Sequence, residues 1–202
     1  MNQSELNRTS YNQIADQWAA ARDNSPINTC IRTFCKLLPG NARILDIGCG
    51  TGRPIDSYLS RKGYYVLGID SSERMIQAAL ACQLPNATFL VGDFMDFTAP
   101  EPFDAVIAFD SLWHIEESKQ ACLYPSVSSL LCPNGYFLFT HGKRRGTVRG
   151  TMFAHQFAYS ALDAEEVKKL LRENSMDIIS WQEEYSEATT GTRDLLVVAK
   201  RR

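Results

Sequence analysis

The stretch that most constrains this chain is residues 42–54, which read as a buried strand, a glycine loop and a helix start. Its apolar run is typical of a strand covered on both faces and consists of Ile44, Leu45 and Ile47. An acid, Asp46, interrupts this run, and three glycines then follow at alternate positions: Gly48, Gly50 and Gly52. Glycine permits left-handed backbone and close approach of a ligand, and Pro54 suits the first turn of a helix. The stretch therefore predicts a ligand site.

The spacing of these glycines argues against a dinucleotide as the ligand. The dinucleotide fingerprint requires two residues between its second and third glycines, whereas only Thr51 separates Gly50 from Gly52. Glycine loops also occur by chance, so the nature of the ligand has to be inferred from the other strand ends.

Three later apolar runs also end at an aspartate, namely Asp70, Asp93 and Asp110. If these runs are neighbouring parallel strands, the three acids gather with Asp46 at the carboxyl edge of one sheet, where open α/β folds bind ligands. Four carboxylates would repel a pyrophosphate but suit ribose hydroxyls, an amine and positive charge. S-adenosylmethionine offers these groups and carries no phosphate. The alternative for each aspartate taken alone is a helix cap or a turn residue.

The second strand and the helix after it provide further candidates. Asp70 lies 22 residues after Gly48, close to the separation at which the acidic residue of dinucleotide folds reaches the ribose hydroxyls. Met75, in a helix predicted from Ser72, suits either an adenine face or the core. The small side chain of Cys49 suits packing behind the ligand.

Five motifs follow one another between residues 43 and 141. They are Leu-Asp-Ile-Gly-Cys-Gly-Thr-Gly, Gly-Ile-Asp-Ser-Ser, Val-Gly-Asp-Phe, Phe-Asp-Ala-Val-Ile-Ala-Phe-Asp-Ser-Leu-Trp-His-Ile and Leu-Cys-Pro-Asn-Gly-Tyr-Phe. In this order and spacing the chain resembles a class I S-adenosylmethionine-dependent methyltransferase of the small-molecule type. The resemblance implies an α/β fold: a Rossmann-like, seven-stranded, mostly parallel sheet with an antiparallel C-terminal hairpin strand and helices on both faces.

The resemblance also implies the roles of particular residues. Asp93 would accept a hydrogen bond from the adenine amine, and Phe94 would supply a backbone donor and an apolar wall. The segment that follows Asp110 would lie beside the methionine moiety and face the acceptor. The expected cofactor-binding residues are Asp46, Gly48, Cys49, Gly50, Gly52, Asp70, Ser71, Met75, Asp93, Phe94, Asp110 and Trp18. The expected substrate-binding residues are Tyr11, Trp113, His114, Phe153 and Phe157.

Composition narrows the class of protein. A chain of 202 residues, 45% of them hydrophobic, predicts one domain over residues 1–202. A net charge of −2 favours neither nucleic acid nor an acidic membrane surface as a partner. The sequence shows no secretory signal and no run long enough to span a bilayer, so a soluble, cytoplasmic protein is expected. The six cysteines show no zinc-ligand spacing, so no metal is expected and the thiols should be reduced.

The two segments outside the motifs are expected to complete the site. Residues 1–40 should form N-terminal cap helices; the helix over 9–22 carries an apolar stripe that includes Tyr11 and Trp18. In the family such a helix often closes over the cofactor, where aromatic rings attract the sulfonium; ordinary packing is the alternative. Residues 141–160 lose all periodicity and are interpreted as a long loop that serves as a substrate lid. Its basic residues suit either a solvated loop or an anion site: Lys143, Arg144, Arg145 and Arg149.

The expected chemistry leaves several alternatives open. Methyl transfer needs an acceptor held in line with the cofactor in a dry site, and a base is optional. His114 is the candidate general base, because it follows the fourth strand and titrates near neutral pH; the alternative is a histidine hydrogen-bonded to structure. The leading hypothesis is a small-molecule methyltransferase. Methylation of RNA or protein, and a cofactor-binding protein without turnover, remain alternatives, and the acceptor atom and oligomeric state are left open.

Overall fold

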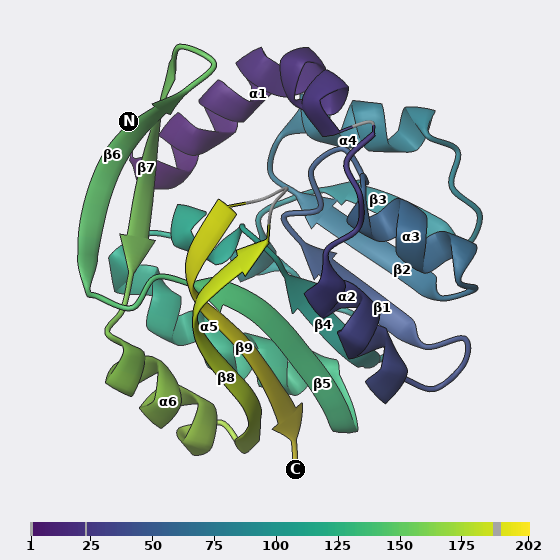
Figure 1. Ribbon diagram of the computed structural model, residues 1–202, viewed down its shortest axis with the longest axis vertical. Coiled ribbons are helices and arrows are strands. Elements are labelled where there is room, and N and C mark those ends of the chain that lie inside the picture. Colours follow the sequence, from purple (N-terminus) through teal and green to yellow (C-terminus); the bar gives the residue numbers. More distant parts are fainter. Residues whose placement is uncertain (1, 23, 188–190) are drawn as a thin grey trace.

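A seven-stranded sheet runs through the molecule in the order β3-β2-β1-β4-β5-β9-β8 (Figure 1). The computed structural model describes residues 2–22, 24–187 and 191–202. The strands are β1 (Arg43–Ile47), β2 (Tyr65–Asp70), β3 (Ala87–Val91), β4 (Phe103–Ala108), β5 (Leu131–His141), β8 (Met176–Glu187) and β9 (Gly191–Arg201). The first five pair in parallel, and β9 is antiparallel to both of its neighbours. The predicted sheet is confirmed, including its antiparallel C-terminal strand. The polar residues Thr189 to Gly191 predict the turn of the C-terminal hairpin, and this prediction falls partly on residues 188–190, outside the described residues.

Helices cover both faces of this sheet because successive residues of a buried strand point to opposite sides. Ile44 packs in a cluster with α2 (Thr29–Phe34) and α3 (Ile55–Arg61). Its neighbour Leu45 packs in a second cluster with α5 (Glu117–Leu130) and α6 (Ala164–Glu173). Both side chains are fully buried, which explains why β1 reads as a continuous apolar run.

The strand order determines where on the sheet a ligand is expected to bind. The sheet is extended from β1 on one side by β2 and on the other by β4, and such a reversal opens a crevice at the carboxyl ends of the strands. Helix α4 (Glu73–Ala81) follows β2, and Ser72 caps its start by accepting a hydrogen bond from the Met75 N–H at 3.2 Å. Helix α1 (Gln3–Arg22) lies beside α4 at this end of the molecule (Figure 1).

The expected loop over residues 141–160 is wrong. Strand β5 continues to His141, and an antiparallel hairpin follows, made of β6 (Gly146–Met152) and β7 (His155–Ala161). No residue of β6 is fully buried, and the positions that alternate with its polar residues hold two glycines, Val148 and Met152, so the strand lacks a continuous apolar face. The turn between the strands consists of Phe153 and Ala154, both with positive φ, without the glycine or asparagine that usually marks such a turn. Strand β7 packs on α1, so the hairpin is part of the cover over the crevice.

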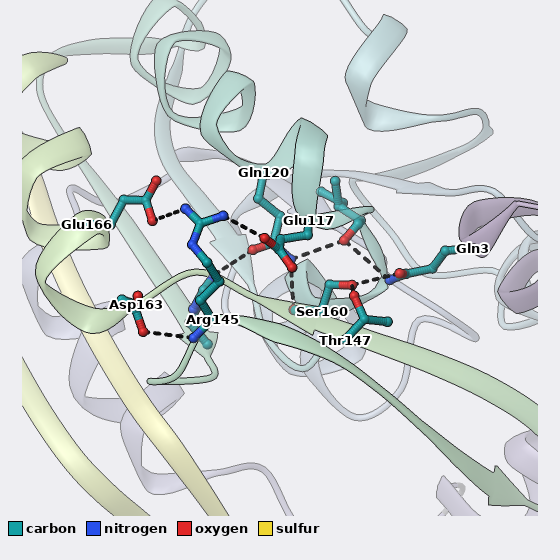
Figure 2. A network of polar contacts seen from close by, with 10 residues as sticks. Gln3, Glu117, Gln120, Arg145, Thr147, Ser160, Asp163 and Glu166 are labelled. Atoms are coloured by element: carbon teal, nitrogen blue, oxygen red, sulfur yellow. Dashed lines mark hydrogen bonds and ion pairs between the residues drawn. The ribbon is translucent and has the colours of Figure 1, made fainter.

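Arg145 fixes the base of this hairpin to two helices (Figure 2). Its guanidinium pairs with Glu117 of α5 at 2.6 Å and with Glu166 of α6. Its backbone N–H donates to the Asp163 carboxylate at 2.9 Å. One of the four basic residues expected here is therefore neutralised within the fold, and Lys143 likewise pairs with Glu184.

Polar contacts tie the same end of the hairpin to α5 and α1 through Ser160 of β7 (Figure 2). The Gln120 amide donates to the carbonyl of Ser160 at 2.7 Å. The Ser160 hydroxyl donates to Gln3 Oε1 at 2.7 Å and lies 2.7 Å from the Thr147 hydroxyl. The hairpin therefore makes side-chain contacts with α1, α5 and α6. These contacts favour a hairpin that is fixed in position over a freely moving loop.

We expect Ser160→Ala to lower the free energy of unfolding by about 1–2 kcal/mol, because it removes the buried hydroxyl that donates to Gln3 Oε1. Urea denaturation followed by circular dichroism measures this loss. Ser129→Ala is the matched control, since its exposed hydroxyl bonds only within α5. Equal stability of the two variants would show that the hairpin is not held through this contact.

Candidate functional site

A cavity lies at the carboxyl edge of the sheet, bounded by strand ends, the glycine loop and α1. It brings together most of the residues predicted from the sequence: Tyr11, Trp18, Asp46, Gly48, Cys49, Gly50, Asp70, Ser71, Met75, Asp93, Phe94, Asp110 and His114. The four aspartates are therefore gathered around one site, as their positions at the strand ends predict.

Four predicted residues do not line this cavity. Gly52 is buried beneath the loop, where an added Cβ would lie 3.1 Å from the ring of Phe89. Phe157 is wholly buried behind Tyr11, with ring centroids 4.9 Å apart. Phe153 is exposed at the tip of the β6–β7 hairpin, and Trp113 lies outside the cavity, its ring 5.9 Å from the guanidinium of Arg193. The two phenylalanines were predicted from a lid that is in fact a hairpin, whereas Gly52 was predicted from the glycine-loop motif and Trp113 from the family resemblance.

The glycine loop closes tightly against the second strand. The N–H groups of Gly48 and Cys49 both donate to the carbonyl of Ile69, at 2.8 and 3.2 Å. Gly48 has φ +74°, and an added Cβ would lie 2.4 Å from Cβ of Ser111. No other residue fits there without a shift of the backbone. Cys49 packs under the loop, and burial raises the pKa of its thiol, so it remains neutral.

Asp70 joins the glycine loop to α4. One carboxylate oxygen accepts from the Gly50 N–H at 3.0 Å and the other from the Ser72 N–H at 2.8 Å. Burial raises the pKa of Asp70, and these two donors oppose that shift. Each oxygen keeps a further lone pair for a ligand hydroxyl.

Asp46 has a buried acidic partner that the sequence analysis missed. Asp56, in the first turn of α3, is 0% exposed and Asp46 is 3% exposed. Burial raises the pKa of both carboxyl groups, and the charge of Asp46 raises that of Asp56 further. The pair therefore holds a proton that exposed carboxyl groups would have lost. An acid two residues after a proline gives no signal of such a partner.

The other two aspartates, Asp110 and Asp93, already interact with groups of the protein. Asp110 forms a two-point ion pair with Arg193 of β9, with its Oδ1 2.6 Å from Nε, and both side chains are largely buried. Asp93 is exposed and accepts the Met95 N–H at 2.9 Å, so it also serves as a cap. Both still line the cavity.

Arg22 brings a positive charge that the sequence analysis did not anticipate. It ends α1, and its guanidinium lies 4.4 Å from the ring centroid of Trp18. In the described part of the chain it forms no ion pair, and it lines the cavity with Arg53 and Asn28. A ligand with both a cationic and an anionic group would find partners of each sign here.

His114 is enclosed by other side chains. Its Nδ1 lies 3.1 Å from Asn7 Nδ2, and its Nε2 lies 2.8 Å from the Tyr11 hydroxyl. Burial lowers its pKa to about 4, against a smaller opposing effect from the carbonyl of Ala158, so the ring is neutral at physiological pH. Both ring nitrogens lie within hydrogen-bonding distance of other side chains. This arrangement matches the alternative to a general base, a histidine hydrogen-bonded to structure. Asn7 was missed because nothing local marks it.

The sheet order, the glycine loop and the ring of acids define the class I S-adenosylmethionine-dependent methyltransferase fold. Residues 44–135 match the family model described as "Methyltransferase domain", and over this segment the chain is similar to that family. Among the described residues no helix is long and apolar enough to cross a membrane. Nor does the described part of the chain hold a cluster of side chains suited to a metal ion.

Three relatives illustrate the similarity. The ubiquinone biosynthesis O-methyltransferase of Xylella fastidiosa is 30% identical over 64% of this chain and 50% of its own length. The 18S rRNA (guanine-N(7))-methyltransferase of Bos taurus is 35% identical over 46% of this chain and 36% of its own. The crystal structure of magnesium protoporphyrin IX methyltransferase from Synechocystis PCC 6803, with bound S-adenosylmethionine, has a TM-score of 0.75 at 19% identity, covering 100% of this chain and 98% of that one. The chain spans roughly half the length of the curated relatives it matches.

Proposed function

We propose that this protein binds S-adenosylmethionine in the cavity and transfers its methyl group to a small-molecule acceptor. The observation that carries the proposal is the gathering of Asp46, Asp70, Asp93 and Asp110 around a glycine loop at the sheet edge. Because the ligand is cationic and lacks phosphate, these acids suit it and would repel a dinucleotide.

The residues present fit this cofactor group by group. The free lone pairs of Asp70 suit the ribose diol, and Asp93 with Phe94 suits the adenine. Met75 is buried beside them. Asp46 suits the ammonium group, and Arg22 the carboxylate, of the methionine portion. The bound cofactor supplies an activated methyl group and a neutral thioether leaving group.

What the chain itself contributes is orientation and exclusion of water. Helix α1 covers the crevice with Tyr11 and Trp18, whose rings meet edge to face at 6.0 Å. No free base is needed for the displacement, and the histidine nearest the cavity is neutral and enclosed. The protein then accelerates methyl transfer mainly by holding the acceptor in line with the methyl group.

The ion pairs made by the basic segment, residues 143–149, favour a small-molecule acceptor over RNA. Lys143 and Arg145, two of its four cations, are paired with acids of the same chain. The ubiquinone biosynthesis O-methyltransferase also aligns over more of this chain, 64%, than the rRNA methyltransferase does, 46%.

Two measurements test the proposal. Isothermal titration with S-adenosylhomocysteine should show binding at micromolar or lower concentration, whereas NAD should give no heat of binding. A mass-spectrometric screen of phenols, carboxylic acids, amines and thiols should then reveal a product heavier by one methylene. Binding of NAD without the adenosyl compound would refute the cofactor assignment, and transfer to RNA alone would refute the acceptor class.

A further inference from the structure

The contacts of Asn7 settle which way its side-chain amide faces. Its Oδ1 accepts from the N–H of Ala158 at 2.9 Å, and its Nδ2 donates to the carbonyl of the same residue at 2.8 Å. A flipped amide would place oxygen against carbonyl and N–H against N–H, so only this orientation satisfies the buried backbone of β7.

This orientation fixes the tautomer of His114. The second hydrogen of Asn7 Nδ2 faces His114 Nδ1 at 3.1 Å, so Nδ1 must act as an acceptor. A neutral imidazole whose Nδ1 accepts carries its proton on Nε2. That N–H then donates to the Tyr11 oxygen at 2.8 Å.

The hydroxyl of Tyr11 is consequently left with its own hydrogen to donate elsewhere. In the described part of the chain it has no hydrogen-bond partner besides His114, and the residue lines the cavity. Burial raises the pKa of Tyr11, so the phenol stays protonated and acts as a donor, not as a base.

We propose that Asn7, His114 and Tyr11 form a relay that directs the Tyr11 hydroxyl hydrogen into the cavity, where it binds an oxygen atom of the acceptor. The inference rests on the proposed function and narrows its acceptor to molecules with a phenol, carboxylate or carbonyl oxygen. A protonated amine has no lone pair to offer this donor. His114 and Asn7 are then positioning residues, and Tyr11 is the group that touches the substrate.

The first experiment reads the tautomer directly, without any activity. Nitrogen-15 NMR of the histidine-labelled protein, with His114→Gln to identify its signals among the three histidines, should show a proton on Nε2 only. That state should persist from pH 8 down to pH 5. A proton on Nδ1, or protonation of the ring near pH 6.5, would overturn the relay.

The second experiment measures binding of catechol, benzoate and benzylamine to the complex with S-adenosylhomocysteine. We expect the two oxygen probes to bind and Tyr11→Phe to weaken them about tenfold, the worth of one hydrogen bond. Affinity for S-adenosylhomocysteine should change less than about twofold. Tyr159→Phe is the control, since its ring lies 5.4 Å from that of His114 and its hydroxyl makes no hydrogen bond to another described residue.

Variants at His114 separate a relay from a base. His114→Gln retains an N–H near Nε2 and should keep most of the probe affinity, whereas His114→Leu should lose as much as Tyr11→Phe. A preference for benzylamine, no uptake of either oxygen probe, or a loss confined to S-adenosylhomocysteine would overturn the proposal. Failure of the wild-type protein to bind S-adenosylhomocysteine would instead refute the proposed function, and the NMR result would still decide the relay.

Discussion

Asp70→Ala is expected to weaken binding of S-adenosylhomocysteine by roughly 10- to 150-fold, the range for loss of one hydrogen bond to a charged group. The physical reason is twofold. The carboxylate offers lone pairs to the ribose hydroxyls, and it also holds the Gly50 and Ser72 N–H groups at 3.0 and 2.8 Å. Without it the glycine loop loses its tie to α4, so the site is less ordered before the ligand arrives. Isothermal titration gives the affinity.

The matched control for this prediction is Asp16→Ala. Asp16 also lies near α4, but its exposed carboxylate pairs only with Arg74 on the surface, at 2.9 Å. It should leave the affinity unchanged. If Asp70→Ala bound S-adenosylhomocysteine as tightly as Asp16→Ala does, the ribose contact assigned to Asp70 would be wrong.

The second large effect concerns the buried pair of Asp46 and Asp56. In the folded protein the pair keeps a proton because burial raises both pKa values, whereas in the unfolded chain the carboxyl groups lose theirs near pH 4. Above that pH the unfolded state binds fewer protons than the folded state. The free energy of unfolding therefore falls as pH rises, by about 1.4 kcal/mol per pH unit for each proton retained.

Asp56→Asn should remove most of this loss, since asparagine has the same shape and no proton to release. Urea denaturation at pH 5, 6, 7 and 8 should show the variant gaining stability over the wild type as pH rises. The lowered pKa of His114 contributes in both proteins and cancels from the difference. Asp177→Asn, at a surface pair with Arg202, is the control. Parallel curves for Asp56→Asn and wild type would contradict the shared proton.

The parts of the molecule that could be predicted are those whose determinants are local. Strand β1, its glycine loop and the acids at the strand ends are each encoded by neighbouring residues, and parallel pairing then brings them together. Gly48 belongs here as well, because its conformation is required by the loop that contains it.

The parts that could not be predicted depend on partners far away in the chain. Asn7 meets Ala158 across 151 positions, and Arg193 meets Asp110 across 83, so neither pair has a sequence signature. The β6–β7 hairpin gives only a weak sequence signal, because no residue of β6 is fully buried and the turn contains neither glycine nor asparagine. Asp56 acquires its role only because α3 carries it beneath the loop.

The pairing of Asn7 with Ala158 has a consequence for how the protein is made. A ribosome releases α1 more than a hundred residues before β7, so strands β1 to β6 emerge while α1 still lacks its contacts with β7. Its apolar side chains, among them Ile14 and Ala15, have no partner from β7 during that interval. We expect the nascent polypeptide to gain affinity for the adenosyl ligand only after β7 has left the exit tunnel.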